Sequence, residues 1–274
     1  MSASCNLCGG TDLRVLEAAT DGVRTVQCVT CRLIFLSPFP KFDPATHYDA
    51  EYYRPWLVEQ ARQRAAMWGR RADLLERFAH KGSLLDVGCG EGSFLLGARE
   101  RGWRVTGTEV SRWTTRMLPE AHGLAVLAGD LLEVECPEGT FDALTLWHVL
   151  EHTERPLQTL RRTRSLLRED GVLMVAVPNA GFSLFRVVYP VARLRRLRYY
   201  TPGERELHLH HFTADTLRAM LVAAGFRVVF LGIDESALWP VNILLEKAAK
   251  LVRVLTGACW SEALLIVAAK ASPP

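Results

Sequence analysis

The spacing of apolar residues changes along the chain, and each change marks a different kind of structure. Residues 1–45 show little helical periodicity and are rich in Cys, Gly, Thr and Pro. Residues 51–82 then carry apolar side chains at helical spacing and stop at a Lys-Gly pair. This pattern predicts a helix whose apolar positions are Trp56, Met67, Leu74, Leu75 and Phe78.

From Ser83 onward, short apolar runs alternate with amphipathic segments that end at glycine or begin at a cap. The apolar runs predict strands at 83–88, 103–110, 124–130, 141–150, 171–179, 226–234 and 263–270. The segments between them predict helices at 91–102, 111–123, 155–168 and 213–225, and residues 241–255 are also amphipathic. Strands that alternate with helices form a parallel sheet covered on both faces, so we expect an α/β fold.

These differences in pattern divide the chain into three predicted parts. They are a small module at 1–45, a helical connector at 46–81 and an α/β domain at 82–274. A basic stretch interrupts the domain after its fifth strand, where we expect an inserted lid at about 181–211. A chain of 274 residues can bury one large core and still carry a small appended module.

Composition adds a few constraints. Apolar residues make up 49% of the chain and charged residues 23%, and the net charge of +3 is too small to argue for a nucleic-acid partner. The start MSASCNLCGG lacks the pattern of a signal peptide, and no stretch reaches the roughly 18 apolar residues that span a bilayer. Seven cysteines, an odd number, favour reduced thiols, so we expect a cytoplasmic protein.

The stretch LLDVGCGEGSF lies where the first strand of the α/β domain turns into a helix. Its glycines, Gly88, Gly90 and Gly92, allow the backbone to approach a ligand closely, and the following helix offers free N–H groups. The spacing differs from a dinucleotide fingerprint, and the Lys of a P-loop is missing. Asp86, two residues before the first glycine, can accept a hydrogen bond from a ligand ammonium. The alternative is a tight turn with no ligand.

Residues 81–233 resemble class I S-adenosylmethionine (SAM)-dependent methyltransferases. The resemblance rests on DVGCGEG, on Glu109 and Asp130 at successive strand ends, and on FDALTLWHVLEH. It implies a Rossmann-like, doubly wound sheet of seven strands that binds SAM. Glu109 then holds the ribose hydroxyls, Asp130 and Leu131 meet the adenine, and Trp147 lies near the methyl group. Read without the resemblance, Glu109 is a solvated strand end and Asp130 a helix cap.

Histidines gather at two places, around the end of the predicted strand 141–150 (His148 and His152) and in ELHLHHFT. An oxygen acceptor must lose a proton, and a histidine near its ordinary pKa can take it. The resemblance adds that a His-x-His segment in relatives lines the acceptor pocket, which His208 and His210 match. We therefore expect His148, His208 and His210 to be catalytic. Simple packing of His148 and a His/His/Glu metal site stay open as alternatives.

The segment 182–200 carries five arginines interleaved with aromatic residues and no acidic residue. Arginine binds phosphate and carboxylate through paired N–H donors, so we expect an anionic small-molecule acceptor. A lipid carrier at a membrane surface also fits. RNA fits less well, because one short basic segment is a small surface for binding nucleic acid. A solvated helix face is the alternative.

Two Cys-x-x-Cys pairs near the N-terminus, Cys5/Cys8 and Cys28/Cys31, have the spacing of a zinc ribbon. Four thiolates close the metal shell, so the predicted Zn²⁺ is structural. The whole chain resembles bacterial SAM-dependent methyltransferases with an N-terminal zinc ribbon, which include enzymes of sugar and secondary-metabolite pathways. It lacks the Pro-Leu-Ala-Asn-like stretch of the sugar C-methyltransferases, which favours an oxygen acceptor over carbon.

The sequence therefore predicts an enzyme that transfers a methyl group from SAM to an oxygen of a small molecule, with carbon as the second choice. A sugar, a phosphorylated intermediate or a lipid-linked intermediate would fit as acceptor. Two other functions stay open. One is methylation of an RNA base, and the other is a non-catalytic binding module in which the zinc ribbon makes the contacts. The acceptor and the oligomeric state are not fixed by the sequence.

Overall fold

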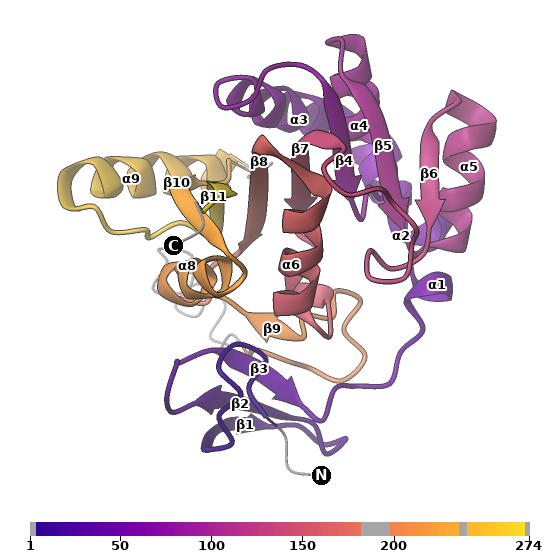
Figure 1. Ribbon diagram of the computed structural model, residues 1–274. Helices are drawn as coiled ribbons and strands as arrows, with labels where there is room; N and C mark the ends of the chain where they lie inside the picture. The colour runs from indigo at the N-terminus through magenta and orange to yellow at the C-terminus, as the bar shows by residue number, and fades with distance from the viewer. Residues whose placement is uncertain (1–3, 182–197, 236–239, 272–274) are drawn as a thin grey trace.

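The computed structural model describes residues 4–181, 198–235 and 240–271. Its centre is a sheet of seven strands in the order β10-β11-β8-β7-β4-β5-β6 (Figure 1). Strands β4 to β8 pair in parallel, and β11 runs antiparallel between β8 and β10. The strands are β4 (Ser83–Val87), β5 (Arg104–Glu109), β6 (Ala125–Ala128), β7 (Phe141–Trp147), β8 (Leu167–Pro178), β10 (Phe226–Ile233) and β11 (Ala263–Lys270).

Helices cover both faces of this sheet, because neighbouring residues of its buried strands point to opposite sides. Leu84 packs with Ala72 and Phe94, whereas Leu85 belongs to the cluster that contains Leu160 and Leu217. Helices α3 (Ala61–Leu75) and α4 (Ser93–Glu100) therefore lie on one face, and α6 (Pro156–Leu166) and α8 (Ala214–Ala223) lie on the other. Helix α5 (Arg112–His122) packs beside α4 through Leu118 and Leu95, and α9 (Pro240–Thr256) lies between β10 and β11 in the chain.

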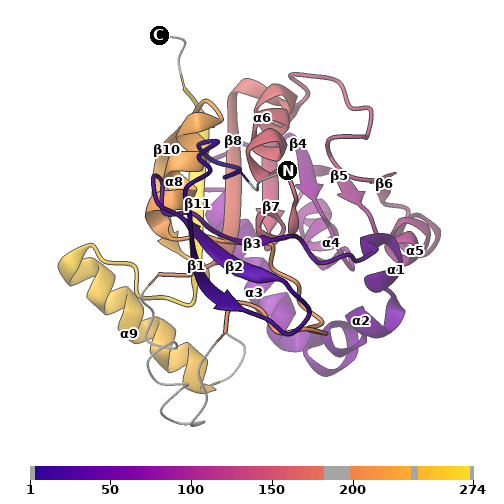
Figure 2. The ribbon, with the colours of Figure 1, turned by 90° about the horizontal axis from the view of Figure 1, so that it is seen from below.

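The N-terminal module is a small antiparallel sheet of β1 (Leu13–Ala18), β2 (Arg24–Cys28) and β3 (Ile34–Ser37). A fourth strand, β9 (His210–His211), comes from the large domain and pairs with β3. In Figure 1 the small sheet lies below the domain, next to β9, and Figure 2, seen from below, shows it in front of the domain. Its buried side chains, Cys28 and Phe35 among them, join the same apolar core as Phe212, so the module is packed onto the domain.

The connector differs from the single helix that the spacing predicts over 51–82. The chain forms α1 (Pro44–His47), α2 (Ala50–Arg54), a π-helical turn η1 (Pro55–Glu59) and only then α3. Pro55 has no N–H to donate and cannot continue an α-helix from α2, which explains the break.

Two further boundaries differ from the prediction. Helix α6 ends at Leu166 and β8 begins at once, so the strand is longer at its start than the predicted 171–179. The predicted lid at 181–211 falls mostly on 182–197, which lie outside the described residues, and its remainder contains β9.

Candidate active site

The turn between β4 and α4 is built from the glycines that the sequence indicates. Gly88, Gly90 and Gly92 have φ values of 65°, 52° and 79°, a left-handed conformation that side chains other than glycine rarely adopt. A Cβ on Gly88 would lie 2.7 Å from a methyl carbon of Val149, so that position has no room for a side chain. The backbone of this turn forms one wall of a cavity of about 820 Å³.

Three carboxylates stand at the ends of neighbouring parallel strands and line the same cavity: Asp86 on β4, Glu109 on β5 and Asp130 after β6. Asp86 is 2% exposed and accepts a hydrogen bond from Oγ1 of Thr145 at 2.6 Å. Burial raises the pKa of Asp86 to about 8 despite this bond. Asp130 accepts from the backbone N–H of Leu132 at 2.7 Å.

Glu109 ties the glycine turn to the second strand of the domain. Its Oε2 accepts from the N–H of Gly90 at 2.8 Å, and its Oε1 accepts from the N–H groups of Val110 and Ser111. The side chain is 5% exposed, and burial raises the pKa of the carboxyl. Glu109 is therefore fixed in orientation before any ligand arrives.

Aromatic side chains of the connector form the opposite wall. The ring of Tyr53 stacks on Trp113 with centroids 5.5 Å apart, and its edge lies 3.4 Å from the position of a Cβ on Gly90. Tyr52 donates from its hydroxyl to Glu206 at 2.5 Å, which holds the connector against the segment before β9. Tyr48 and Trp56 complete this wall.

His148 follows β7 and also lines the cavity. Its backbone is left-handed, with φ 56°, and its Nε2 lies 3.0 Å from Oδ2 of Asp234 at the end of β10. The guanidinium of Arg71 holds the same carboxylate through two hydrogen bonds of 2.9 and 2.5 Å. Burial would lower the pKa of His148, but Asp234 and Glu151 raise it to about 9. His148 is thus a cation at neutral pH.

The structure separates the other two candidate histidines. His208 lines the cavity, and burial lowers its pKa to about 4, so its imidazole is neutral. His210 is fully buried and is not among the residues that line the cavity. Its Nε2 lies 2.9 Å from Nδ2 of Asn6, and its ring packs between Phe35 and Phe212. His210 therefore joins the N-terminal module to the domain.

Several residues of the site were missed by sequence reasoning. Arg71 and Asp234 are 163 positions apart, and an arginine within a polar helix looks like a solvated residue. Arg64 lines the cavity, contacts Glu91 at 3.2 Å and lies over the ring of Trp56. The one signal that sequence could offer was an acidic residue directly after the apolar strand 226–233.

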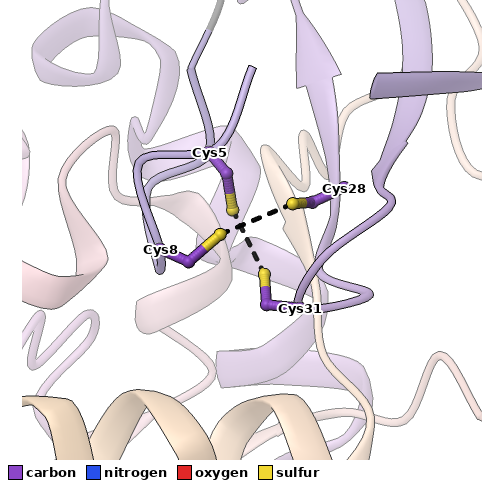
Figure 3. Close-up of side chains that lie close together, drawn as sticks. All are labelled: Cys5, Cys8, Cys28 and Cys31. Carbon is purple, nitrogen blue, oxygen red and sulfur yellow. Dashed lines mark hydrogen bonds between the residues drawn. The ribbon is translucent and has the colours of Figure 1, made fainter. Parts of the chain in front are cut away.

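The four cysteines of the N-terminal module point toward one another (Figure 3). Their sulfur atoms all lie within 4.8 Å of each other, with Cys5 to Cys31 at 3.4 Å and Cys8 to Cys28 at 3.5 Å. Four thiolates at about 2.3 Å from one zinc ion lie roughly 3.8 Å apart, so this cluster has the size of a tetrahedral Cys₄ site.

Comparison with known proteins decides the class of this site. A sequence model for a family described as a methyltransferase domain matches residues 58–231, which is more than half of the chain. The chain belongs to this methyltransferase family. The matched region contains the glycine turn, the three strand-end carboxylates and His148.

Relatives agree with this membership. The methyltransferase is 26% identical over 210 residues to a probable S-adenosylmethionine-dependent methyltransferase of Mycolicibacterium smegmatis, covering 72% of this chain and 76% of that protein. It is 29% identical over 115 residues to a ubiquinone biosynthesis O-methyltransferase of Actinobacillus pleuropneumoniae, covering 38% of this chain and 49% of that protein. The chain thus matches about half the length of the second relative.

Solved structures show the same fold. The 1,6-didemethyltoxoflavin-N1-methyltransferase of Burkholderia thailandensis, with S-adenosylhomocysteine bound, superposes with a TM-score of 0.57 at 17% identity. The superposition covers 95% of this chain and 100% of that chain. The predicted fold class is confirmed, and so is the predicted enzyme class, a SAM-dependent methyltransferase. No described helix is long and apolar enough to cross a membrane.

Proposed function

We propose that the methyltransferase binds SAM in the 820 Å³ cavity and transfers its methyl group to an oxygen of a small-molecule acceptor. The observation that carries the proposal is the convergence of Asp86, Glu109 and Asp130 on that cavity from three neighbouring strand ends. In parallel sheets of this kind, ligands bind outside the carboxyl ends of the strands. The volume lies within the range of about 300–1,000 Å³ that small-molecule sites occupy.

Each carboxylate would meet a different part of the donor. Glu109 would bind the ribose hydroxyls, Asp130 and the backbone of Leu131 would meet the adenine, and Asp86 would face the ammonium group. Gly88 and Gly90 would supply the close backbone approach. An ionised carboxylate only accepts hydrogen bonds, so these residues fit a ligand that presents several donors. An ammonium group beside Asp86 would lower the raised pKa of that carboxyl and favour its ionised form.

Trp147 would lie beside the methyl group, as the sequence predicts. Its indole N–H is buried and has no hydrogen-bond partner in the described part of the chain, and the same holds for Nε of Arg64. Both residues line the cavity.

Methyl transfer needs an oxygen, the methyl carbon and the sulfur in line, so the enzyme contributes mainly by positioning. His208 can accept a hydrogen bond from an acceptor hydroxyl because its imidazole is neutral. His148 is held as a cation with its two nitrogens facing Asp234 and Glu151, so it would act on the acceptor through its charge and not through a free N–H group. We do not assign His210 to this step, because it is buried outside the cavity.

An anionic acceptor remains a prediction. The arginines on which this prediction rests lie mostly at 186–196, outside the described residues. An oxygen acceptor has support from the relative named as an O-methyltransferase, which matches over 115 residues.

We also propose that Cys5, Cys8, Cys28 and Cys31 bind one structural Zn²⁺. A cluster of four thiols fits zinc in spacing and ligand type. An added Cβ on Gly10 would lie 3.3 Å from the sulfur of Cys8, so Gly10 packs closely beside the cluster. Because β3 pairs with β9, a metal that orders the module also orders the segment that carries His208.

Calorimetric titration with SAM tests the donor site. We expect the wild-type protein to bind SAM and Glu109→Gln to bind it at least about tenfold more weakly, which is about 1.4 kcal/mol. Glu120→Gln is the matched control, because Glu120 is an exposed residue of α5. Equal affinity in all three proteins, each with an unchanged thermal unfolding midpoint, would overturn the assigned site.

A further inference from the structure

The carboxylate of Glu151 is buried without hydrogen bonds. Glu151 lies in η2 (Leu150–His152), a short 3₁₀ turn after β7, and is 1% exposed. Neither of its oxygens accepts a hydrogen bond from the described residues. A buried charge costs several kcal/mol unless it is paired and hydrogen-bonded, or binds a metal ion. Glu151 therefore needs a partner that protein atoms do not supply at hydrogen-bond distance.

His148 is the described side chain that comes closest to pairing with the Glu151 carboxylate. Its Nδ1 lies 3.5 Å from Oε1 of Glu151, while its Nε2 lies 3.0 Å from Asp234. His148 thus makes its hydrogen bond to Asp234 and reaches Glu151 only at ion-pair distance. The second oxygen of Glu151 receives nothing from His148 in this arrangement.

Two other imidazoles complete a set of metal ligands around Glu151. One ring nitrogen each from His152 and His208 and one oxygen of Glu151 all lie within 4.8 Å of one another. The two rings lie 4.9 Å apart between centroids. Both histidines line the cavity, whereas Glu151 lies beneath its wall.

The tautomer of His152 is the one that a metal ligand needs. Its Nδ1 lies 2.6 Å from the carbonyl oxygen of Leu207, and a carbonyl can only accept, so Nδ1 carries the proton. The lone pair is then on Nε2, which lies 4.0 Å from Oε1 of Glu151. Metal-binding histidines are typically oriented by such a bond from the other nitrogen to a carbonyl or carboxylate.

The backbone holds the two segments together at this point. The N–H of Leu209 donates to the carbonyl oxygen of Glu151 at 2.8 Å, one residue from His208. The three side chains are therefore fixed from both sides, by η2 and by the segment before β9. Such a preset arrangement suits a binding site.

We propose that Glu151, His152 and His208 bind a divalent transition-metal ion at the part of the 820 Å³ cavity that His152 and His208 line. Two imidazoles and one carboxylate are a ligand set for zinc, iron or related ions that leaves coordination positions open. Because two of the three ligands line the cavity, a ligand bound there could reach the open positions of the ion. This site is separate from the Cys₄ cluster of the N-terminal module.

The proposal deepens the proposed function and names an acceptor class, a compound whose hydroxyl can bind the metal. A bound cation lowers the pKa of the hydroxyl, which releases its proton to water. The acceptor oxygen then forms a bond to the methyl carbon while the carbon–sulfur bond breaks. The electron pair of the broken carbon–sulfur bond stays on sulfur, and S-adenosylhomocysteine is the leaving group. His208 would then act through the metal.

Cobalt(II) titration of the full-length protein, prepared with one equivalent of zinc per chain, tests the site. We expect one further equivalent of Co²⁺ to bind, with visible bands that lack the sulfur-to-cobalt charge transfer of a thiolate site. Glu151→Gln and His208→Ala should each weaken this binding at least about tenfold. His122→Ala is the control, because His122 is an exposed histidine of α5.

SAM titration of the same proteins separates this proposal from the donor site. Wild-type protein that binds SAM but no further cobalt would overturn the metal site and leave the proposed function standing. In that case the ion pair with His148 is the whole role of Glu151. Co²⁺ binding that survives in both folded variants would also overturn the site. Glu109→Gln should lose SAM affinity and still bind the further equivalent of Co²⁺.

Discussion

Nε2 of His148 lies 3.0 Å from Oδ2 of Asp234, and this contact joins the loop after β7 to the end of β10. Asp234 is also held by the buried guanidinium of Arg71 on α3. Three elements far apart in sequence therefore meet in one ionic network beside the cavity. The network keeps His148 charged and fixes its ring in the wall of the cavity, with its two nitrogens facing Asp234 and Glu151.

We expect Asp234→Asn to destabilise the protein by about 3–5 kcal/mol near neutral pH. The substitution leaves Arg71, a residue only 4% exposed, as a buried charge without its partner. Urea unfolding at pH 7 measures the loss. Asp73→Asn is the control, since the Asp73 side chain pairs with Arg101 while 67% exposed, and should change stability by less than about 1 kcal/mol.

The unfolding free energy of the same variant should fall less than that of the wild type as the pH is lowered into the acid range. Burial alone would raise the pKa of Asp234, but Arg71 and His148 hold it well below its ordinary value. The stabilisation is therefore complete above the unfolded-state pKa of about 3.9 and is lost as the pH falls below it. The difference in unfolding free energy between wild type and Asp234→Asn should shrink below that pH. Parallel curves down to the lowest measurable pH would contradict this explanation.

Gly88→Ala should abolish SAM binding by moving the glycine turn. The new methyl group would have both a left-handed backbone and a contact of 2.7 Å with Val149. Gly139→Ala is the matched control, because Gly139 has φ 61° and open space around the added atom. We expect the control to lose about 1–2 kcal/mol of stability and to keep its SAM affinity. Equal affinity for SAM in both variants would argue against a ligand at this turn.

Cys28→Ser should release zinc and loosen the N-terminal module. The buried apolar side chains of the module belong to a core shared with the domain, so metal binding should supply much of the free energy that holds the two Cys pairs together. Zinc content per chain and limited proteolysis within residues 1–45 measure the effect, and we expect cleavage to rise by at least about tenfold. Cys136→Ser is the control, a free cysteine outside the cluster. Full zinc content in Cys28→Ser would exclude the Cys₄ assignment.

Much of the fold and donor side of the site could be predicted because both depend on local patterns. Apolar runs fix the strands, and the carboxyl ends of parallel strands share one edge, so Asp86, Glu109 and Asp130 were expected near each other. The structure brings all three to one cavity. The residues expected to bind the methyl donor can thus be recognised from short stretches of sequence.

The acceptor side could not be predicted in the same way, because it depends on contacts between distant segments. The Arg71–Asp234 pair joins residues 163 positions apart, and β9 pairs with a strand more than 170 residues earlier. That pairing takes His210 into the core of the module, while His208, two residues away, faces the cavity. Alternation along a strand gave no hint of which histidine would point where, because the partner strand could not be identified.

A crystal structure of the full chain with S-adenosylhomocysteine tests the central claim most directly. The account expects the ribose hydroxyls within hydrogen-bond distance of Glu109, the adenine beside Asp130 and Leu131, and the sulfur facing His208 across the cavity. Ligand bound elsewhere, with the side chains of Tyr48 and Tyr53 filling the space above Gly90, would contradict it.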